Sequence, residues 1–158
     1  MTIKDYNKLV EKHSDGLFRF LVKQIGSADI VEDIMQESFL RLWENRRRVD
    51  LSKAKSYLFT IAYNRMIDEV RRDRYISLET DRKAKSNSRS IDLKELLDQA
   101  LSQLPHIQRS LVLLRDYEGY SYSEIGEVLG ISQEKVKVYL FRARKTLREY
   151  IGSIDNII

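Results

Sequence analysis

The residues from Ser121 to Arg148 predict two helices joined by a tight turn. Ser121 is followed three residues later by Glu124, the spacing of a capping box at a helix start. Gly130 is expected to end that helix, because glycine enters the left-handed C-cap conformation without a steric penalty. Ser132 is then placed to cap the next helix at once. This pattern predicts a helix-turn-helix.

The second of these helices is basic on its outer side and apolar on its inner side. Its cations are Lys135, Lys137, Arg142, Arg144, Lys145 and Arg148. The residues predicted to be buried between the two helices are Ile125, Val128, Leu129, Ile131, Val136, Leu140, Ala143 and Leu147. The outward residues are Gln133, Lys137, Val138, Phe141, Arg142 and Lys145. An apolar seam behind a cationic face favours DNA binding over an ordinary solvated helix, the alternative that the turn alone leaves open.

The rest of the chain is predicted to be helical too, so the expected fold class is all-α. Only one proline and six glycines occur among 158 residues, and apolar residues recur with a helical period almost throughout. Thr2 and Asp5 have capping-box spacing, and Gly26 is a stop signal. Helices are predicted at about 2–25, 28–45, 53–74, 92–104 and 105–117, with an irregular basic stretch at 46–52.

Residues 77–91 divide the chain. They are polar, almost free of apolar residues and without periodicity, so they cannot bury enough surface to offset the entropy of ordering. We expect a flexible linker there, between a three-helix domain at 1–76 and a four-helix domain at 92–158.

Composition limits the possible functions. The net charge of +4 and a pI near 9.2 suit a polyanionic partner, and residues 41–74 carry ten Lys and Arg against five acids. The absence of cysteine, of a signal peptide and of any membrane-length apolar stretch predicts a cytoplasmic protein. The only histidines, His13 and His106, have no triad or metal-site pattern nearby. We therefore expect no catalysis, cofactor or metal, and interpret His106 as a surface residue.

The second helix is predicted to bind protein. One face carries Asp33, Gln36, Glu37, Leu40 and Glu44. The opposite face carries the core-like Val31, Ile34, Met35, Ser38 and Leu42. An acidic face that exposes a leucine suits a basic protein groove, whereas a solvated polar face is the alternative that spacing alone favours.

The third helix has the opposite charge. Its core side is predicted to carry Phe59, Ala62, Met66 and Val70. Another side carries Ile61, Asn64, Asp68, Arg71 and Arg72, continuing the positive field of Arg46, Arg47 and Arg48. The Asn64 amide can read a base edge, and arginines suit phosphates. Nearby aromatic residues can stack on unpaired bases, although for Trp43 and Phe59 burial in the core is favoured.

Three blocks of this sequence resemble one protein family. They are residues 33–43 (DIMQESFLRLW), residues 57–68 (YLFTIAYNRMID), and Leu104-Pro105 followed by the hairpin. In this order they are similar to bacterial RNA polymerase sigma factors of the sigma-70 family, in the small two-domain extracytoplasmic-function (ECF) group. The resemblance covers nearly the whole chain.

The resemblance implies a role for each surface. Asp33, Gln36, Glu37 and Leu40 would dock on the clamp helices of the largest polymerase subunit, and the flap of the second-largest subunit would be a further contact. Arg46, Arg47, Arg48, Asn64, Arg71 and Arg72 would read and open the −10 promoter element, with one base flipped into a pocket made by the loop and Asn64 at that pocket. Arg115, Lys137, Val138, Phe141, Arg142 and Lys145 would lie at or near the −35 DNA. An anti-sigma factor is a further candidate partner.

The competing prediction is a stand-alone helix-turn-helix regulator whose N-terminal half senses a signal or dimerises. Such a protein binds paired half-sites as a dimer. A sigma factor would instead bind DNA weakly alone and tightly with core polymerase.

Overall fold

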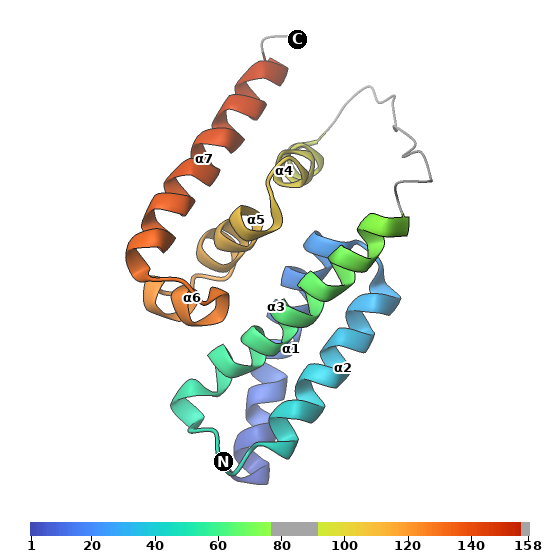
Figure 1. Ribbon diagram of the computed structural model, residues 1–158, viewed down its shortest axis with the longest axis vertical. Helices are drawn as coiled ribbons and strands as arrows, with labels where there is room; N and C mark the ends of the chain where they lie inside the picture. The colour runs from blue at the N-terminus through green and yellow to red at the C-terminus, as the bar shows by residue number, and fades with distance from the viewer. Residues whose placement is uncertain (77–91, 156–158) are drawn as a thin grey trace.

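The computed structural model describes residues 1–76 and 92–155, and every regular element within them is helical. This confirms the predicted all-α class. The elements are α1 (Ile3–Ile25), α2 (Ala28–Glu44), α3 (Leu51–Ile76), α4 (Leu93–Ser102), α5 (His106–Val112), the π-helix η1 (Leu113–Tyr117), α6 (Tyr122–Leu129) and α7 (Gln133–Asp155). The predicted linker lies outside the described residues. We call α1–α3 the N-terminal bundle and α4–α7, with η1, the C-terminal bundle (Figure 1).

Local signals set the ends of α1 and α2 where the sequence predicts them. The Thr2 hydroxyl accepts from the Asp5 amide at 3.1 Å, and the Asp5 carboxylate accepts from the Thr2 amide at 3.1 Å. This capping box lowers the pKa of Asp5. Gly26 ends α1 at φ 85°, and Ser27 caps α2. The third helix begins and ends two residues outside its predicted limits, within the usual uncertainty of helix boundaries.

The predicted helix at 105–117 changes its hydrogen bonding partway along. Residues 106–112 are α-helical, and η1 then widens to a π-helix, in which the Glu118 amide donates to the Leu113 carbonyl at 3.0 Å. The wider turn buries Leu113 and Leu114 together and leaves Arg115 half-exposed beside the start of α6. No feature of the sequence pattern had indicated this change.

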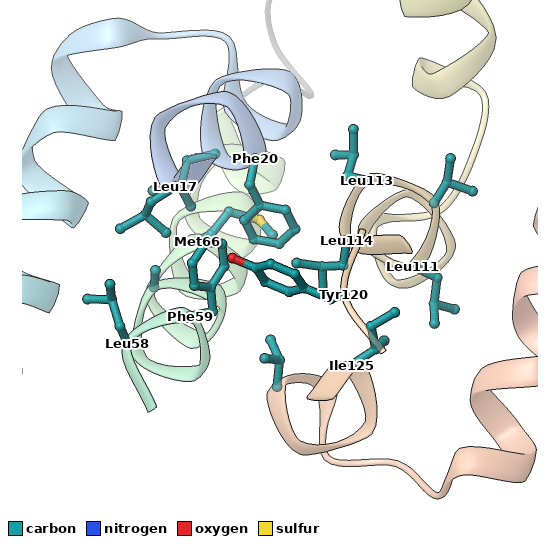
Figure 2. Packing of buried hydrophobic residues seen from close by; sticks show 14 of the residues in the cluster. Leu17, Phe20, Leu58, Phe59, Met66, Leu111, Leu113, Leu114, Tyr120 and Ile125 are labelled. Atoms are coloured by element: carbon teal, nitrogen blue, oxygen red, sulfur yellow. The ribbon is translucent and has the colours of Figure 1, made fainter. Parts of the chain in front are cut away.

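The two bundles share one hydrophobic core. Tyr120, just before α6, packs edge-on against Phe59 of α3 with ring centroids 5.2 Å apart, and Phe59 in turn lies 5.9 Å from Phe20 of α1. Figure 2 shows the Tyr120 ring between Phe59 and Leu114. Burial raises the pKa of the Tyr120 hydroxyl. Helix α6 therefore rests on α3, while α2 and α7 lie at opposite edges of the molecule in Figure 1.

Ion pairs surround this apolar contact. They join Arg19 to Glu118 at 2.9 Å, Lys23 to Asp98 at 3.0 Å, Lys53 to Glu127 at 2.8 Å and Lys55 to Glu124 at 2.5 Å. In each pair the cation comes from the N-terminal bundle and the acid from the C-terminal bundle. We call this contact between the two bundles, with its apolar centre and these four pairs, the inner contact.

A buried polar network completes the inner contact. The buried Gln24 side chain donates to the Ser110 hydroxyl at 2.6 Å, and its oxygen lies 3.0 Å from His106 Nδ1. Arg109 donates to the carbonyl of Leu104 at 3.0 Å, and burial lowers its pKa. The interpretation of His106 as a surface residue is therefore wrong, because its ring is half-buried against α1.

Candidate DNA-binding and protein-binding surfaces

The helix-turn-helix forms as the sequence predicts. Ser121 and Glu124 make both hydrogen bonds of the capping box, at 3.1 and 3.0 Å, and Gly130 takes the left-handed conformation at φ 70°. The Ser132 hydroxyl accepts from the Lys135 amide at 3.2 Å and caps α7. Gly126 also matters, although sequence reasoning missed it. A Cβ at Gly126 would lie 2.7 Å from the Ile131 carbonyl oxygen, so glycine lets the turn close tightly.

The predicted seam and outer face are also confirmed. The hairpin buries Ile125, Val128, Val136, Leu140 and Ala143, while Leu129, Ile131 and Leu147 pack partly buried against the core. The outward residues Gln133, Lys137, Val138, Phe141, Arg142 and Lys145 are all exposed. Among them Phe141 is 64% and Val138 46% exposed, unusual for apolar side chains between cations. Such residues suit apolar contacts in a DNA groove, for instance with a thymine methyl group.

Folding brings two predicted DNA-binding cations together although 22 positions separate them. The guanidinium of Arg115 lies 4.5 Å from the centre of the Tyr122 ring, and the Lys137 ammonium lies 5.8 Å from the same centre. Arg115 also donates to the Tyr120 carbonyl at 2.9 Å. We call Arg115, Lys137, Val138, Phe141, Arg142 and Lys145 the α7 surface.

An ion pair fixes α7 against the rest of its bundle. Arg144 donates to both carboxylate oxygens of Asp116, at 3.1 and 2.5 Å, and these hydrogen bonds raise the Arg144 pKa. Such a bidentate pair defines orientation as well as distance. Arg144 therefore has a structural partner inside the bundle. The sequence pattern counted it only as one more cation of the basic helix.

The basic stretch before α3 is a turn around a small hollow. The Arg46 guanidinium stacks 3.8 Å over the Trp43 ring and donates to the Trp43 carbonyl at 2.9 Å, whereas Arg47 and Arg48 are exposed. A hollow of about 430 Å³ opens beside them. It is lined by Asn45, Arg48, Val49, Asp50, Lys53 and Tyr57. Its cations and its tyrosine are suitable partners for a phosphate and an unstacked base.

The predicted residues of α3 divide between surface and core. Asn64, Arg71 and Arg72 are exposed, and Arg72 lies 3.6 Å from Glu69. Ile61 was predicted to share their side, but it is buried, so that part of the prediction is wrong. Asn64 does not line the hollow. It lies seven residues beyond Tyr57 on the same face of α3, about 10 Å along the helix. We call Arg46, Arg47, Arg48, Asn64, Arg71 and Arg72 the α3 surface.

The predicted acidic face of α2 is exposed and continues into an apolar groove. Asp33, Gln36 and Leu40 face outward, with Leu40 55% exposed. Glu37 forms an ion pair with Arg65 of α3, which reduces the negative charge of the face. A groove of about 720 Å³ shares Gln36 and Leu40 with this face. Its apolar lining comprises Ile3, Tyr6, Val10, Met35, Phe39 and Trp43.

The contribution of α1 to this groove was missed, because Ile3, Tyr6 and Val10 have the spacing of ordinary core residues. Trp43 and Met35, both expected in the core, are half-buried and line the groove instead. We call Asp33, Gln36, Glu37, Leu40 and the groove the α2 surface.

Neither a metal cluster nor a membrane span is found in the described part of the chain. No group of three or more His, Cys, Asp or Glu residues at 1–76 and 92–155 is arranged to hold a metal ion. No helix within those ranges is long and apolar enough to cross a membrane.

Known proteins are similar to this chain in sequence and in fold. Residues 9–75 match the family model for sigma-70 region 2, and residues 94–147 match the model for sigma-70, region 4. The chain is 29% identical to ECF RNA polymerase sigma factor SigM of Bacillus subtilis (strain 168) over 150 residues, which cover 90% of this chain and 92% of SigM. It is 31% identical to ECF RNA polymerase sigma factor SigL of Mycobacterium tuberculosis (strain ATCC 25618 / H37Rv), with 89% and 85% covered.

The fold has a solved counterpart as well. The sigma factor RpoE from Bartonella quintana, in complex with the anti-sigma factor NepR, superposes with a TM-score of 0.76 at 23% identity, covering 95% of this chain and 98% of that one. The two matched regions follow each other in the order that the three sequence blocks predict, and each contains one of the two cationic surfaces. The chain belongs to the ECF group of RNA polymerase sigma factors.

Proposed function

We propose that this protein is a promoter-specificity subunit that binds core RNA polymerase and initiates transcription at promoters with −10 and −35 elements. The observation that carries the proposal is the separation of two exposed cationic surfaces onto different bundles, with an acidic and apolar surface on α2. The α7 surface would read the −35 element and the α3 surface the −10 element. The protein would work in the cytoplasm, beside polymerase.

Most charges of the α3 surface and the α7 surface are available for phosphates. Within the described residues, Arg47, Arg48, Arg71, Lys137, Arg142 and Lys145 form no ion pair. Cations of this kind release the counterions of DNA when they bind it, which makes affinity strongly dependent on salt. The hollow beside Arg48 would take one unstacked base, with Tyr57 as a stacking partner.

The α2 surface fits a basic, amphipathic partner. Its acids would meet cations of the partner, and the adjacent groove would take an apolar side chain beside Leu40. We propose the clamp helices of the largest polymerase subunit as that partner, and the flap of the second-largest subunit as a contact of the C-terminal bundle. Because the solved relative is bound to an anti-sigma factor, we also propose that a protein of that class holds this chain inactive.

The described arrangement has to open before both promoter elements can be read. A compact chain of 158 residues has a radius of gyration of about 15 Å, hence a diameter of about 40 Å. The −10 and −35 elements lie about 25 base pairs apart, which is about 85 Å at 3.4 Å per base pair. The chain at 77–91 is long enough to span about 50 Å when extended. We therefore propose that the inner contact breaks when polymerase binds.

Run-off transcription tests the function. Purified core polymerase is incubated with this protein and a library of templates randomised at both elements, and transcripts are sequenced. We expect transcription that depends on both components and selects two short elements. A stand-alone regulator would instead bind DNA equally tightly without core polymerase, and that result, together with no transcript, would refute the proposal.

A further inference from the structure

The Tyr122 ring lies among cations from two different elements. Tyr122 is the first residue of α6 and is half-buried. Arg115 approaches its ring from η1, and Lys137 approaches it from α7. The two cations lie within about 10 Å of each other, which is one Debye length at 0.1 M salt, so they repel each other.

An aromatic ring can hold two cations in place without neutralising their charge. The negative face of the ring attracts a guanidinium or an ammonium group. A ring does not neutralise the charge, as a carboxylate does, and it leaves the N–H donors free. The same bundle offers the contrasting case, because Arg144 is held by the Asp116 carboxylate through two hydrogen bonds. Arg115 also donates one N–H to the Tyr120 carbonyl at 2.9 Å. Neither Arg115 nor Lys137 has an acid partner among the described residues, whereas the charge of Arg144 is matched by Asp116.

We propose that Tyr122 is a positioning residue for the −35 element, whose ring holds Arg115 and Lys137 in place before DNA arrives. The proposal rests on the proposed function and assigns a part of it to a residue that makes no DNA contact itself. Long side chains lose rotamer freedom when they bind, so cations ordered in advance bind more tightly than free ones. The contribution of the Tyr122 ring to DNA affinity therefore depends on the two cations, and it should disappear when they are absent.

The test is a double-mutant cycle on the assembled holoenzyme. Full-length variants are bound to core polymerase, and affinity for a labelled promoter duplex chosen from the run-off selection is measured at several salt concentrations. Tyr122→Phe keeps the ring and removes only the hydroxyl, which hydrogen-bonds Arg144. Because Asp116 still holds Arg144 through two hydrogen bonds, this variant should stay within about twofold of the wild type. Tyr122→Leu keeps an apolar side chain without the ring and should weaken binding roughly five- to thirtyfold, because two long side chains then have to be ordered when DNA binds. In an Arg115→Ala, Lys137→Ala background, the same change to leucine should have no further effect.

Three results would overturn the proposal. They are wild-type affinity for Tyr122→Leu, an equal loss from Tyr122→Leu with and without the two cations, and an equal loss from Tyr122→Phe and Tyr122→Leu. If Tyr122→Leu melts below the assay temperature, Tyr122→Met replaces it, with the same expected loss and the same contradicting results. A wild-type protein that neither binds core polymerase nor supports transcription would overturn the proposed function as well. If the wild type transcribes but the double-mutant cycle shows no coupling between Tyr122 and the two cations, only the proposed role of Tyr122 is wrong.

Discussion

The inner contact and the outward surfaces treat charge in opposite ways. In the inner contact, four cations of the N-terminal bundle each pair with an acid of the C-terminal bundle, around the edge-on contact of the Tyr120 and Phe59 rings. On the α7 surface, the exposed Lys137, Arg142 and Lys145 have no acid partner among the described residues. A surface whose charges are paired within the folded chain stabilises the closed arrangement. A surface with unpaired charges is available to bind a partner.

This difference also indicates which contact can break when a partner binds. Lys53, Arg19 and Asp98 remain well exposed, and exposed ion pairs contribute little to stability because water and salt screen them. Contacts between bundles of one chain usually permit relative motion unless they are large and hydrophobic, so the apolar centre around Tyr120 and Phe59 is the part that has to separate. The inner contact is therefore suited to hold the free chain closed and to break when a stronger partner binds. Substitutions on the outward surfaces should change binding, and those in the inner contact should change shape.

Reversal of charge on the α2 surface should have the largest effect. We expect Asp33→Lys with Glu37→Lys to weaken core polymerase binding more than about hundredfold, since each buried charge pair at an interface contributes several kcal/mol. Copurification with core polymerase measures the loss. Glu11→Lys with Glu149→Lys is the matched control, because both residues are exposed, lie outside the α2 surface and change the net charge equally.

Because Glu37 pairs with Arg65, Asp33→Lys alone separates docking from the loss of that ion pair. The melting temperature of the Asp33→Lys variant should remain near that of the wild type, because Asp33 is exposed and exposed substitutions rarely cost more than about 0.5 kcal/mol. Normal copurification of the double variant would show that α2 is not the docking surface.

Removal of single cations from the α7 surface should have the next largest effect. Lys137→Ala and Arg142→Ala should each weaken −35 binding by about 1–3 kcal/mol if they contact bases, and relax selection at one position. Binding of the holoenzyme to a panel of single-base promoter variants measures both quantities. An equal loss on every sequence, with a shallower salt dependence, would show instead that the cation contacts only phosphate. Lys135→Ala is the control, as an exposed cation of α7 outside the α7 surface.

Asn64 should have a smaller and more selective effect. Asn64 lies outside the hollow, so its amide would bind an unpaired base next to the extruded one, which also has to regain its lost stacking and pairing energy. Loss of one amide should cost about 1 kcal/mol, or roughly fivefold, in open-complex formation, with closed-complex binding unchanged. Permanganate footprinting on a duplex promoter and on a pre-melted bubble compares the two steps. An unchanged footprint with unchanged base preference would remove Asn64 from the site.

Acidification should have the smallest effect, and it should act on the inner contact alone. His13 lies at a hollow between the bundles, which is also lined by Lys12, Lys55 and Glu124. Burial lowers the His13 pKa, and the positive charges of Lys55 and Lys12 lower it further. The unfolded chain therefore takes up this proton first, so the contribution of neutral His13 is complete above about pH 6.5 and is lost as the pH falls through the folded pKa.

We expect the melting temperature to fall by a few degrees at most between pH 7.5 and 5.5 through this group. Thermal melts of the wild type and of His13→Gln measure the difference, and the variant should have the shallower pH dependence. Identical pH dependence of the two melting temperatures would show that protonation of His13 does not affect the stability of the closed arrangement.

Helix ends and helix faces could be predicted from the sequence because both are local. Thr2, Ser121 and Ser132 each cap a helix that begins within a residue of its predicted start, and the buried side of the hairpin follows from a 3.6-residue period. The outward exposure of Lys137, Phe141 and Arg142 follows from the same period. These features depend on neighbours within about four positions, which a single sequence shows directly.

Contacts between distant segments could not be predicted. Lys53 meets Glu127 across 74 positions, and Gln24 meets His106 across 82. Periodicity identifies which face of a helix is buried but not which other helix covers it. The inner contact, the location of His106, the meeting of Arg115 and Lys137 at Tyr122, and the α1 side of the apolar groove therefore required the structure. The π-helical turn at Leu113 was missed too, because its residues have ordinary helical spacing.

The distance between the two bundles tests most directly whether the inner contact opens. The chain contains no cysteine, so Glu11→Cys and Glu149→Cys, both at exposed positions, give a doubly labelled protein for single-molecule energy transfer. Opening of the inner contact predicts one short distance in the free protein and a distance longer by tens of Å in a transcribing holoenzyme on its promoter, since the two promoter elements lie about 85 Å apart. An unchanged short distance in a holoenzyme that transcribes would contradict it.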